Sequence, residues 1–167
     1  MSEPRPVPFW SVEEVEASLT ATLAHLARAG VLAYPTETVY GFGGSADQSG
    51  VDALVGLKGR APGKPFLLLI AGSEMIARLG LHLTGAASTL AARHWPGPLT
   101  LVLPGGEHRV PDRLRGPEGG VAVRWTPHPG LGRLIRAYGE PITSTHRVGS
   151  ADLWSPENPR AHSALCT

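Results

Sequence analysis

The chain is poor in cysteine, lysine and charge. It has one cysteine, Cys166, and only two lysines among its 15 basic residues. A single cysteine excludes an intrachain disulfide and a cysteine-based metal cluster, which favours a reducing, intracellular setting. Charged residues make up 17% of the chain and the formal net charge is +1. A nucleic-acid site would therefore have to be a local patch, because the chain as a whole does not attract polyanions.

Long apolar runs and several common motifs are also missing. No run approaches the length of a membrane span, and the start, MSEPRPVPFW, lacks the basic-then-apolar pattern of a signal peptide. We therefore expect a cytoplasmic protein without membrane contact. The seven histidines are scattered, so no protein-held metal is expected. The sequence contains no Walker-type phosphate loop, no G-x-G-x-x-G opening a helix and no G-x-S-x-G, so it lacks these signatures of nucleotide and acyl-transfer sites.

What is present predicts a single α/β (α+β) domain. The chain has 167 residues, 42% of them hydrophobic, with 21 glycines and 16 prolines, as in a loop-rich domain with a real core. Ser11 and Glu14 form a capping box that opens a helix ending at Gly30. Shorter helices are expected at 51–58, 84–95 and 129–138. Strands are expected at 31–34, 38–40, 66–70, 99–103, 121–125 and 141–145.

The last part of the chain has a different character. Residues 146–167 follow neither the helical nor the strand period, and Pro156 and Pro159 interrupt any element. We expect a domain over residues 1–145 followed by an irregular C-terminal tail over 146–167. Residues 107–120 also lack a period and are expected to form a loop.

Both lysines lie in one short basic segment. Lys58 and Lys64 flank Arg60, between glycines and prolines that make the loop short and stiff. Two compact ammonium charges beside a planar guanidinium suit a phosphate chain. The alternative is a solvated basic loop without a ligand.

A second group of polar residues follows the first predicted strand. Thr36, Glu37 and Thr38 come directly after the apolar run 31–34, which is where open α/β sheets bind ligands. The alternative is that the two threonines only cap a turn. Arg124 lies in another apolar strand and could hold a carboxylate in bidentate fashion, or it could be an exposed edge residue. Thr100 interrupts a third apolar strand.

Together these segments resemble a known family. PTETVYGFG, KGRAPGKPFLLLI, WPGPLTLVLP, VAVRWTPHP and PITST occur in this order between about residue 30 and residue 145. The combination is similar to the YrdC-like threonylcarbamoyl-AMP synthase family. The resemblance implies a single-domain twisted mixed sheet flanked by helices, with a basic concave cavity.

The resemblance also implies an activity. Members of this family are nucleotidyltransferases that convert L-threonine, bicarbonate and ATP, with Mg²⁺, into threonylcarbamoyl-adenylate and pyrophosphate. A downstream transfer complex then moves the threonylcarbamoyl group to tRNA. Family members are also described as binding tRNA or double-stranded RNA. A binding module that has lost turnover is therefore the competing hypothesis, and a carbamoyl-adenylate-forming relative is a weaker third.

Matching positions imply the site. Thr36, Arg124 and Thr143 would contact threonine, with Arg124 on its carboxylate. Three cations and one hydroxyl would bind ATP, namely Lys58, Arg60, Lys64 and Ser144. No side chain acts as a covalent catalyst, because preorganised cations stabilise the leaving pyrophosphate.

The resemblance departs from the family pattern in two ways. It ends after Thr145, which indicates a divergent or truncated C-terminus, and one motif around that point is altered. The family's Ser-x-Asn motif is replaced here by Ser144-Thr145-His146. The hypotheses are that nucleotide binding is weakened or that His146 takes the place of the asparagine as a hydrogen-bonding group. A titration with ATP distinguishes them, because ATP affinity that survives His146→Ala would exclude a role for that side chain.

Overall fold

The computed structural model describes residues 5–58, 65–146 and 163–166, and its centre is a mixed eight-stranded sheet. The strands are β1 (Arg5–Val7), β2 (Val31–Tyr34), β3 (Gly41–Gly43), β4 (Leu67–Ile70), β5 (Leu101–Leu103), β6 (Val121–Trp125), β7 (Ile142–His146) and β8 (Ser163–Cys166). Their order across the sheet is β1-β8-β2-β3-β7-β4-β6-β5. β4 and β6 are parallel, and the other named pairs are antiparallel.

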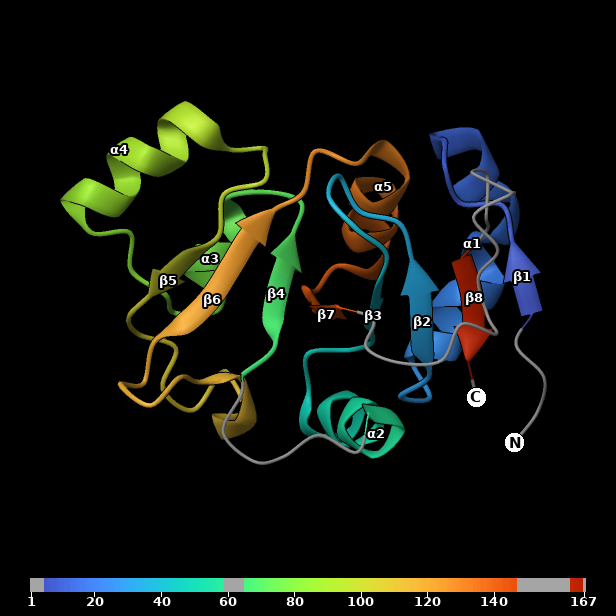
Figure 1. The fold of residues 1–167 in the computed structure, drawn as a ribbon, viewed down its shortest axis with the longest axis horizontal. Coiled ribbons are helices and arrows are strands. Elements are labelled where there is room, and N and C mark those ends of the chain that lie inside the picture. Colours follow the sequence, from blue (N-terminus) through green and yellow to red (C-terminus); the bar gives the residue numbers. More distant parts are fainter. Residues whose placement is uncertain (1–4, 59–64, 147–162, 167) are drawn as a thin grey trace.

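Within the described residues, five α-helices surround this sheet (Figure 1). They are α1 (Val12–Leu26), α2 (Gln48–Lys58), α3 (Glu74–Arg78), α4 (Gly85–His94) and α5 (Pro129–Tyr138), and η1 (Asp112–Leu114) is a single 3-10 turn. α1 and α5 pack against each other behind the sheet, α2 lies below β3, and α4 contacts the edge strand β5.

Local signals explain several of these boundaries. The Ser11 hydroxyl accepts the Glu14 N–H while the Glu14 carboxylate accepts the Ser11 N–H, which confirms the capping box at α1. Gly139 ends α5 in the left-handed conformation, with φ of 83°, as a C-terminal glycine does. The core lies between the sheet and α1, α3 and α5, and its largest fully buried side chains include Tyr34, Phe9, Leu131 and Leu134.

Three predicted boundaries are displaced for identifiable reasons. α2 begins at Gln48 rather than Val51, because the Asp47 side chain accepts the Gly50 N–H and opens the helix earlier. The strand predicted at 38–40 is wrong: this stretch bends, and the strand comes next, at Gly41–Gly43. The loop predicted at 107–120 contains η1, whose Leu114 is buried in the core.

The prediction of an irregular tail is wrong for residues 163–166, which form a strand. β8 (Ser163–Cys166) pairs with β1 on one side and β2 on the other, so part of 146–167 belongs to the sheet. β7 also continues to His146, whose backbone lies opposite Gly41. Residues 147–162 lie outside the described residues, and the boundary at residue 145 stays a prediction. Among the described helices, none is long and apolar enough to cross a membrane.

Candidate functional site

A polar turn connects β2 to β3 and is held by one hydroxyl. The Thr36 Oγ1 donates to the Val39 carbonyl oxygen at 2.6 Å and accepts the Thr38 and Val39 N–H groups at 3.2 Å each. Thr36 therefore caps a turn, as one of the two sequence interpretations expected. This turn fixes Glu37 and Thr38 as the residues that reach across the sheet to β6, which is separated from β3 by β7 and β4.

Arg124 meets this turn near the end of β6. Its Nε donates to the Thr100 Oγ1 at 3.0 Å, and its Nη1 donates to the Glu37 Oε1 at 3.0 Å and the Thr38 Oγ1 at 3.3 Å. Both charged side chains are mostly buried, with 14% of Arg124 and 12% of Glu37 exposed. The Thr126 hydroxyl donates to the other oxygen of Glu37, Oε2, at 3.0 Å. An ion pair with this little solvent is less screened than a surface pair.

The strand alternation of β6 decides which residues reach this site. Val121 and Val123 are fully buried in the core, while Ala122 and Arg124 lie on the opposite face of the strand. Arg124 is thus held on the face that the core does not use. This excludes the interpretation of Arg124 as an exposed edge residue, since three residues from two distant segments, 37–38 and 100, bond to it.

Beside this turn, β2, β3 and β7 pack tightly against one another, and we call these three strands the wall. The Tyr34 hydroxyl donates to the Thr143 carbonyl oxygen at 2.6 Å. The Thr143 Oγ1 accepts the Gly44 N–H at 2.9 Å and donates to the Gly44 carbonyl oxygen at 3.1 Å. A Cβ on Gly43 would lie 1.7 Å from the Thr143 carbonyl oxygen, so only glycine permits this approach.

Thr143 and Ser144 are both buried in this wall. Burial raises the pKa of the Tyr34 phenol, and its hydrogen bond with Ser144 opposes this rise. The Thr143 hydroxyl is engaged by the Gly44 backbone, and the Ser144 hydroxyl lies beside Tyr34. The contacts of Thr143 with threonine and of Ser144 with ATP stay predictions, and the structure adds a packing role to each.

His128 connects Glu37 and its partner Thr126 to α5. Its ring Nδ1 accepts the Leu131 N–H at 3.2 Å and so caps the helix, while its backbone N–H donates to the Thr126 Oγ1 at 3.1 Å. The neutral ring therefore carries its proton on Nε2, which is buried without a partner in the described part of the chain. Burial lowers the pKa of the His128 imidazole, and the charge of Glu37 opposes this.

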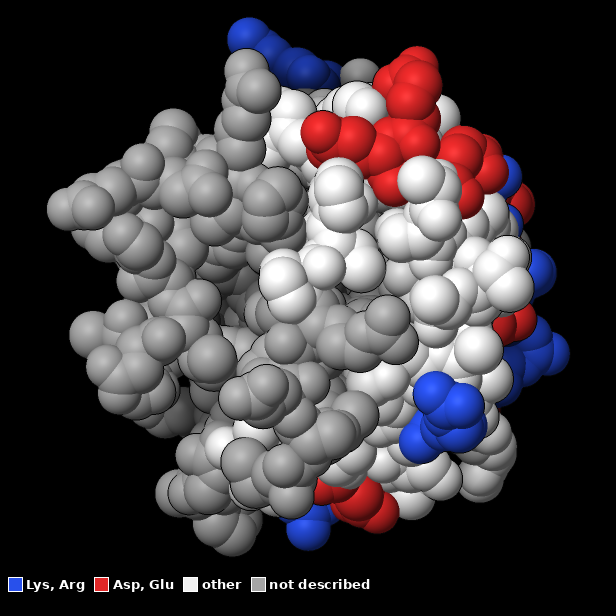
Figure 2. All heavy atoms as spheres, turned by 90° about the vertical axis from the view of Figure 1, so that its right-hand side faces the viewer, with Lys and Arg blue, Asp and Glu red and all other residues white. Residues whose placement is uncertain are grey.

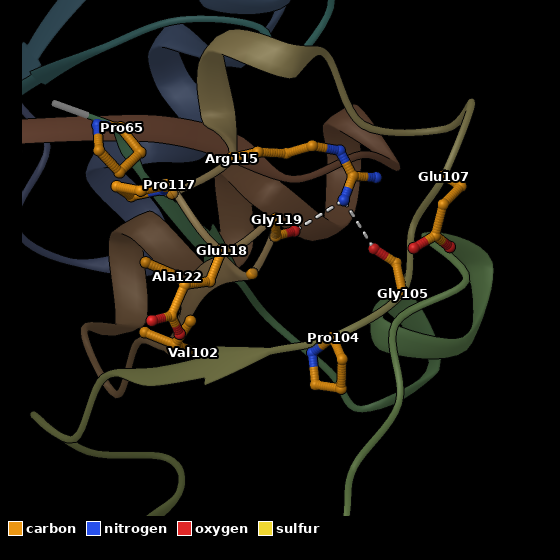
Figure 3. A pocket seen from close by; sticks show the side chains of 12 residues that line it. Pro65, Val102, Pro104, Gly105, Glu107, Arg115, Pro117, Glu118, Gly119 and Ala122 are labelled. Atoms are coloured by element: carbon orange, nitrogen blue, oxygen red, sulfur yellow. Dashed lines mark hydrogen bonds between the residues drawn. The ribbon is translucent and has the colours of Figure 1, made fainter. Parts of the chain in front are cut away.

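A cavity of about 600 Å³ lies farther along the same face of β6 (Figure 3). Ala122 lines it, as do Pro65 and two acidic residues, Glu107 and Glu118. Arg115 reaches it from the loop before β6, and its Nη1 donates to the carbonyl oxygens of Gly105 at 3.0 Å and Gly119 at 2.8 Å. This guanidinium is used to hold the backbone of two loops together.

Two of the three predicted phosphate-binding cations fall outside the part of the chain that the structure describes. Lys58 is the last residue of α2, and Arg60 and Lys64 lie outside the described residues. Their role and the basic character of the cavity stay predictions. The role of the His146 side chain stays one too.

The sequence alone placed Glu37 in a polar group suited to bind a ligand but did not identify its pairing with Arg124, and it did not single out Thr126 or His128. Thr126 follows Arg124 at the two-residue spacing that returns a strand to the same face. That spacing could have identified Thr126. The signal for His128 is its place directly before Pro129, because proline is common at the first position of a helix and the residue before it is the cap.

The fold and the site together define the class of protein. This is an α/β protein with a mixed sheet, in which a partly buried arginine–carboxylate pair and several hydroxyls occupy the sheet face opposite the core. The Sua5/YciO/YrdC family model, described as "Telomere recombination", matches residues 24–161. The chain belongs to this family, which confirms the resemblance that its motifs indicated.

Relatives and solved structures agree with this assignment. A threonylcarbamoyl-AMP synthase of Marinobacter nauticus is 39% identical over 117 residues, which are 70% of this chain and 62% of the relative. One of Pyrococcus abyssi is 41% identical over 115 residues, 68% of this chain and 34% of the relative. The chain thus spans less than two thirds of the length of these relatives.

Two solved structures share the fold. Pyrococcus abyssi Sua5, described as complexed with L-threonine, has a TM-score of 0.72 and 36% identity, over 78% of this chain and 38% of that one. Escherichia coli YciO has a TM-score of 0.71 at 22% identity, over 86% of this chain and 71% of that one, and it supports the fold alone. The predicted YrdC-like α/β fold is confirmed.

Proposed function

We propose that this protein is an L-threonylcarbamoyladenylate synthase. The observation that carries the proposal is Arg124, a guanidinium bonded by hydroxyls and a carboxylate on the face of β6 opposite the core, in a chain related to proteins named threonylcarbamoyl-AMP synthase. A partly buried arginine is suited to bind the carboxylate of an amino acid through charge-assisted hydrogen bonds. The solved relative described with L-threonine supports threonine as that amino acid.

The proposed reaction has two steps. The deprotonated threonine amine attacks the carbon of bicarbonate, with loss of water, or of carbon dioxide, with loss of an amine proton, and either route gives a carbamate. A carbamate oxygen then attacks the α-phosphorus of ATP, and the bond from this phosphorus to the bridging oxygen breaks to release pyrophosphate. Charge grows on the leaving pyrophosphate, so cations that are already in place lower the barrier without reorganising.

Each predicted residue has a place in this scheme. Arg124 binds the α-carboxylate, and Thr36 and Thr143 shape the threonine subsite through the turn and the wall that they hold. The ATP phosphates are assigned to Lys58, Arg60 and Lys64, with Ser144 near the nucleotide. Mg²⁺ would arrive bound to ATP. Among the described residues, no three His, Cys, Asp or Glu side chains are grouped to hold a metal.

The test is pyrophosphate release by the purified chain with each substrate omitted in turn. We expect release that requires threonine, bicarbonate and ATP together, and that stops when any one is left out. Release from ATP and bicarbonate without threonine, or no release at all, would contradict the proposal. The product should then serve a transfer complex that modifies tRNA.

The same experiment distinguishes the synthase from the competing hypothesis, an RNA-binding module without turnover. Binding of RNA by backbone contacts needs a basic surface. On the face drawn in Figure 2, acidic side chains gather in one place and the described basic side chains are scattered. This face therefore offers less support for RNA binding than Arg124 offers for an amino acid.

A further inference from the structure

The Arg124–Glu37 pair is unusual for a site that has to bind an anion. Glu37 already neutralises the guanidinium at 3.0 Å, and a bare arginine would attract a simple carboxylate more strongly. The pair has no net charge but a strong dipole. A ligand that carries one positive and one negative group close together complements such a pair better than an anion does.

Both partners keep hydrogen-bonding capacity beyond their mutual contact. The Arg124 Nη1 uses its two N–H groups on Glu37 and Thr38, and Nε uses its one on Thr100. The two N–H groups of Nη2 have no partner in the part of the chain that the structure describes, so they are available to a carboxylate. Each oxygen of Glu37 accepts one hydrogen bond, Oε1 from Arg124 and Oε2 from Thr126, and can accept one more.

Glu37 is also unable to swing away easily. Thr36 fixes the base of its turn with three hydrogen bonds, and the two Glu37 oxygens are bonded to different residues of the 121–126 segment. A fixed carboxylate contributes to specificity, because it repels a ligand without a compensating positive charge at little reorganisation cost.

We propose that Glu37 is a specificity-determining residue, which selects a zwitterionic α-amino acid by accepting a hydrogen bond from its α-ammonium group while Arg124 binds its α-carboxylate. The two charged groups of an α-amino acid are separated by one carbon, which matches two protein charges in direct contact. This inference rests on the proposed function, in which Arg124 holds the threonine carboxylate. It adds the partner of the amino group in the initial complex.

The experiment compares two ligands on the full chain by calorimetric titration: L-threonine, and 3-hydroxybutyrate, which is threonine without its amino group. We expect wild type to bind threonine at least about tenfold more tightly. Glu37→Gln keeps a hydrogen-bonding side chain without the charge. It should weaken threonine binding by about tenfold and strengthen 3-hydroxybutyrate binding, so the two affinities move in opposite directions.

Two further variants separate charge from scaffold. Glu37→Asp keeps the charge and should preserve the preference for threonine, even if both ligands bind less tightly. Glu140→Gln removes a carboxylate from the exposed pair with Arg78 and should change neither affinity.

The outcomes that overturn the inference are distinct. If Glu37→Gln weakens the binding of threonine and of 3-hydroxybutyrate equally, Glu37 is a purely structural residue. If it changes neither affinity, Glu37 does not select the ligand. If Glu37→Gln does not fold, equal binding of the two ligands to wild type overturns the inference without any variant. Failure of wild type to bind threonine would instead overturn the proposed function, and with it the inference.

Discussion

Arg115 and Arg124 lie beside the two ends of β6 and are buried to nearly the same degree, with 13% and 14% of their side chains exposed. Their partners differ. Arg115 donates to two backbone carbonyl oxygens, and the carboxylate beside it, the fully exposed Asp112, lies 4.0 Å from its Nε. Arg124 instead bonds to a mostly buried carboxylate and two hydroxyls from two other parts of the chain. Residue type and burial therefore do not distinguish Arg115, which holds the scaffold, from Arg124, which we propose as the site arginine, but the chemistry of the partners does.

The largest expected effect is on activity, at Arg124. Arg124→Ala should lower kcat/KM for threonine by about 100-fold, or about 2.7 kcal/mol, because a charge-assisted contact is lost and Glu37 is left unpaired. Arg124→Lys keeps the charge but loses the planar fork, so it should lie between alanine and wild type. Initial rates of pyrophosphate release at varied threonine concentration measure this effect.

A matched control removes an arginine from an ion pair elsewhere. Arg133 on α5 pairs with Glu16 on α1, and Arg133→Gln should leave kcat/KM unchanged. If Arg133→Gln lowers activity as much as Arg124→Ala does, the difference between the two ends of β6 has no functional meaning.

The second effect is on stability, at Arg115. Arg115→Ala leaves the carbonyl oxygens of Gly105 and Gly119 without their donor, and should lower the free energy of unfolding by about 1–3 kcal/mol. Urea unfolding measures this loss. The threonine kcat/KM of the folded variant should stay within twofold of wild type, on the order of a few tenths of a kcal/mol. A selective loss of activity at unchanged stability would reverse the assignment of the two arginines.

The sequence predicted the parts of this comparison that depend on neighbouring residues. The β6 strand at Val121–Trp125 and the capping box at Ser11 follow from local alternation and capping chemistry, and the structure confirms both. Arg124 was singled out for the same reason, as a charge in an apolar strand. Its partner could not be found this way, because Glu37 is 87 positions away and only the sheet brings the two together.

Long-range pairing also explains the largest error. β8 has no clear strand period in the sequence, and it is ordered by pairing with β1 and β2, which flank it on either side. Backbone hydrogen bonds to two neighbours can hold a strand whose side chains give little signal. The role of Arg115 was missed for a related reason, since its acceptors are backbone carbonyls that a sequence does not distinguish.

The smallest expected effect is a pH dependence of stability at His128. It tests whether the Glu37 carboxylate, which pairs with Arg124, also acts on the histidine that caps α5. Burial lowers the pKa of the native imidazole, and the charge of Glu37 opposes this. In the unfolded chain the pKa returns to about 6.5, so the unfolded state binds the proton more readily. The free energy of unfolding should therefore fall as the pH is lowered through 6.5, and level off below the native pKa.

His128→Asn provides the control for this dependence. Asparagine is a good helix cap and does not titrate, so it should keep α5 capped and remove the His128 share of the pH dependence. Protonation of His128 also places a hydrogen on Nδ1, which then faces the Leu131 N–H and opens the cap. In Glu37→Gln the charge that favours the protonated ring is absent, so stability should begin to fall at the same pH but continue to a lower one. Urea unfolding between pH 5 and pH 8 would disprove this link if wild type and His128→Asn gave parallel curves.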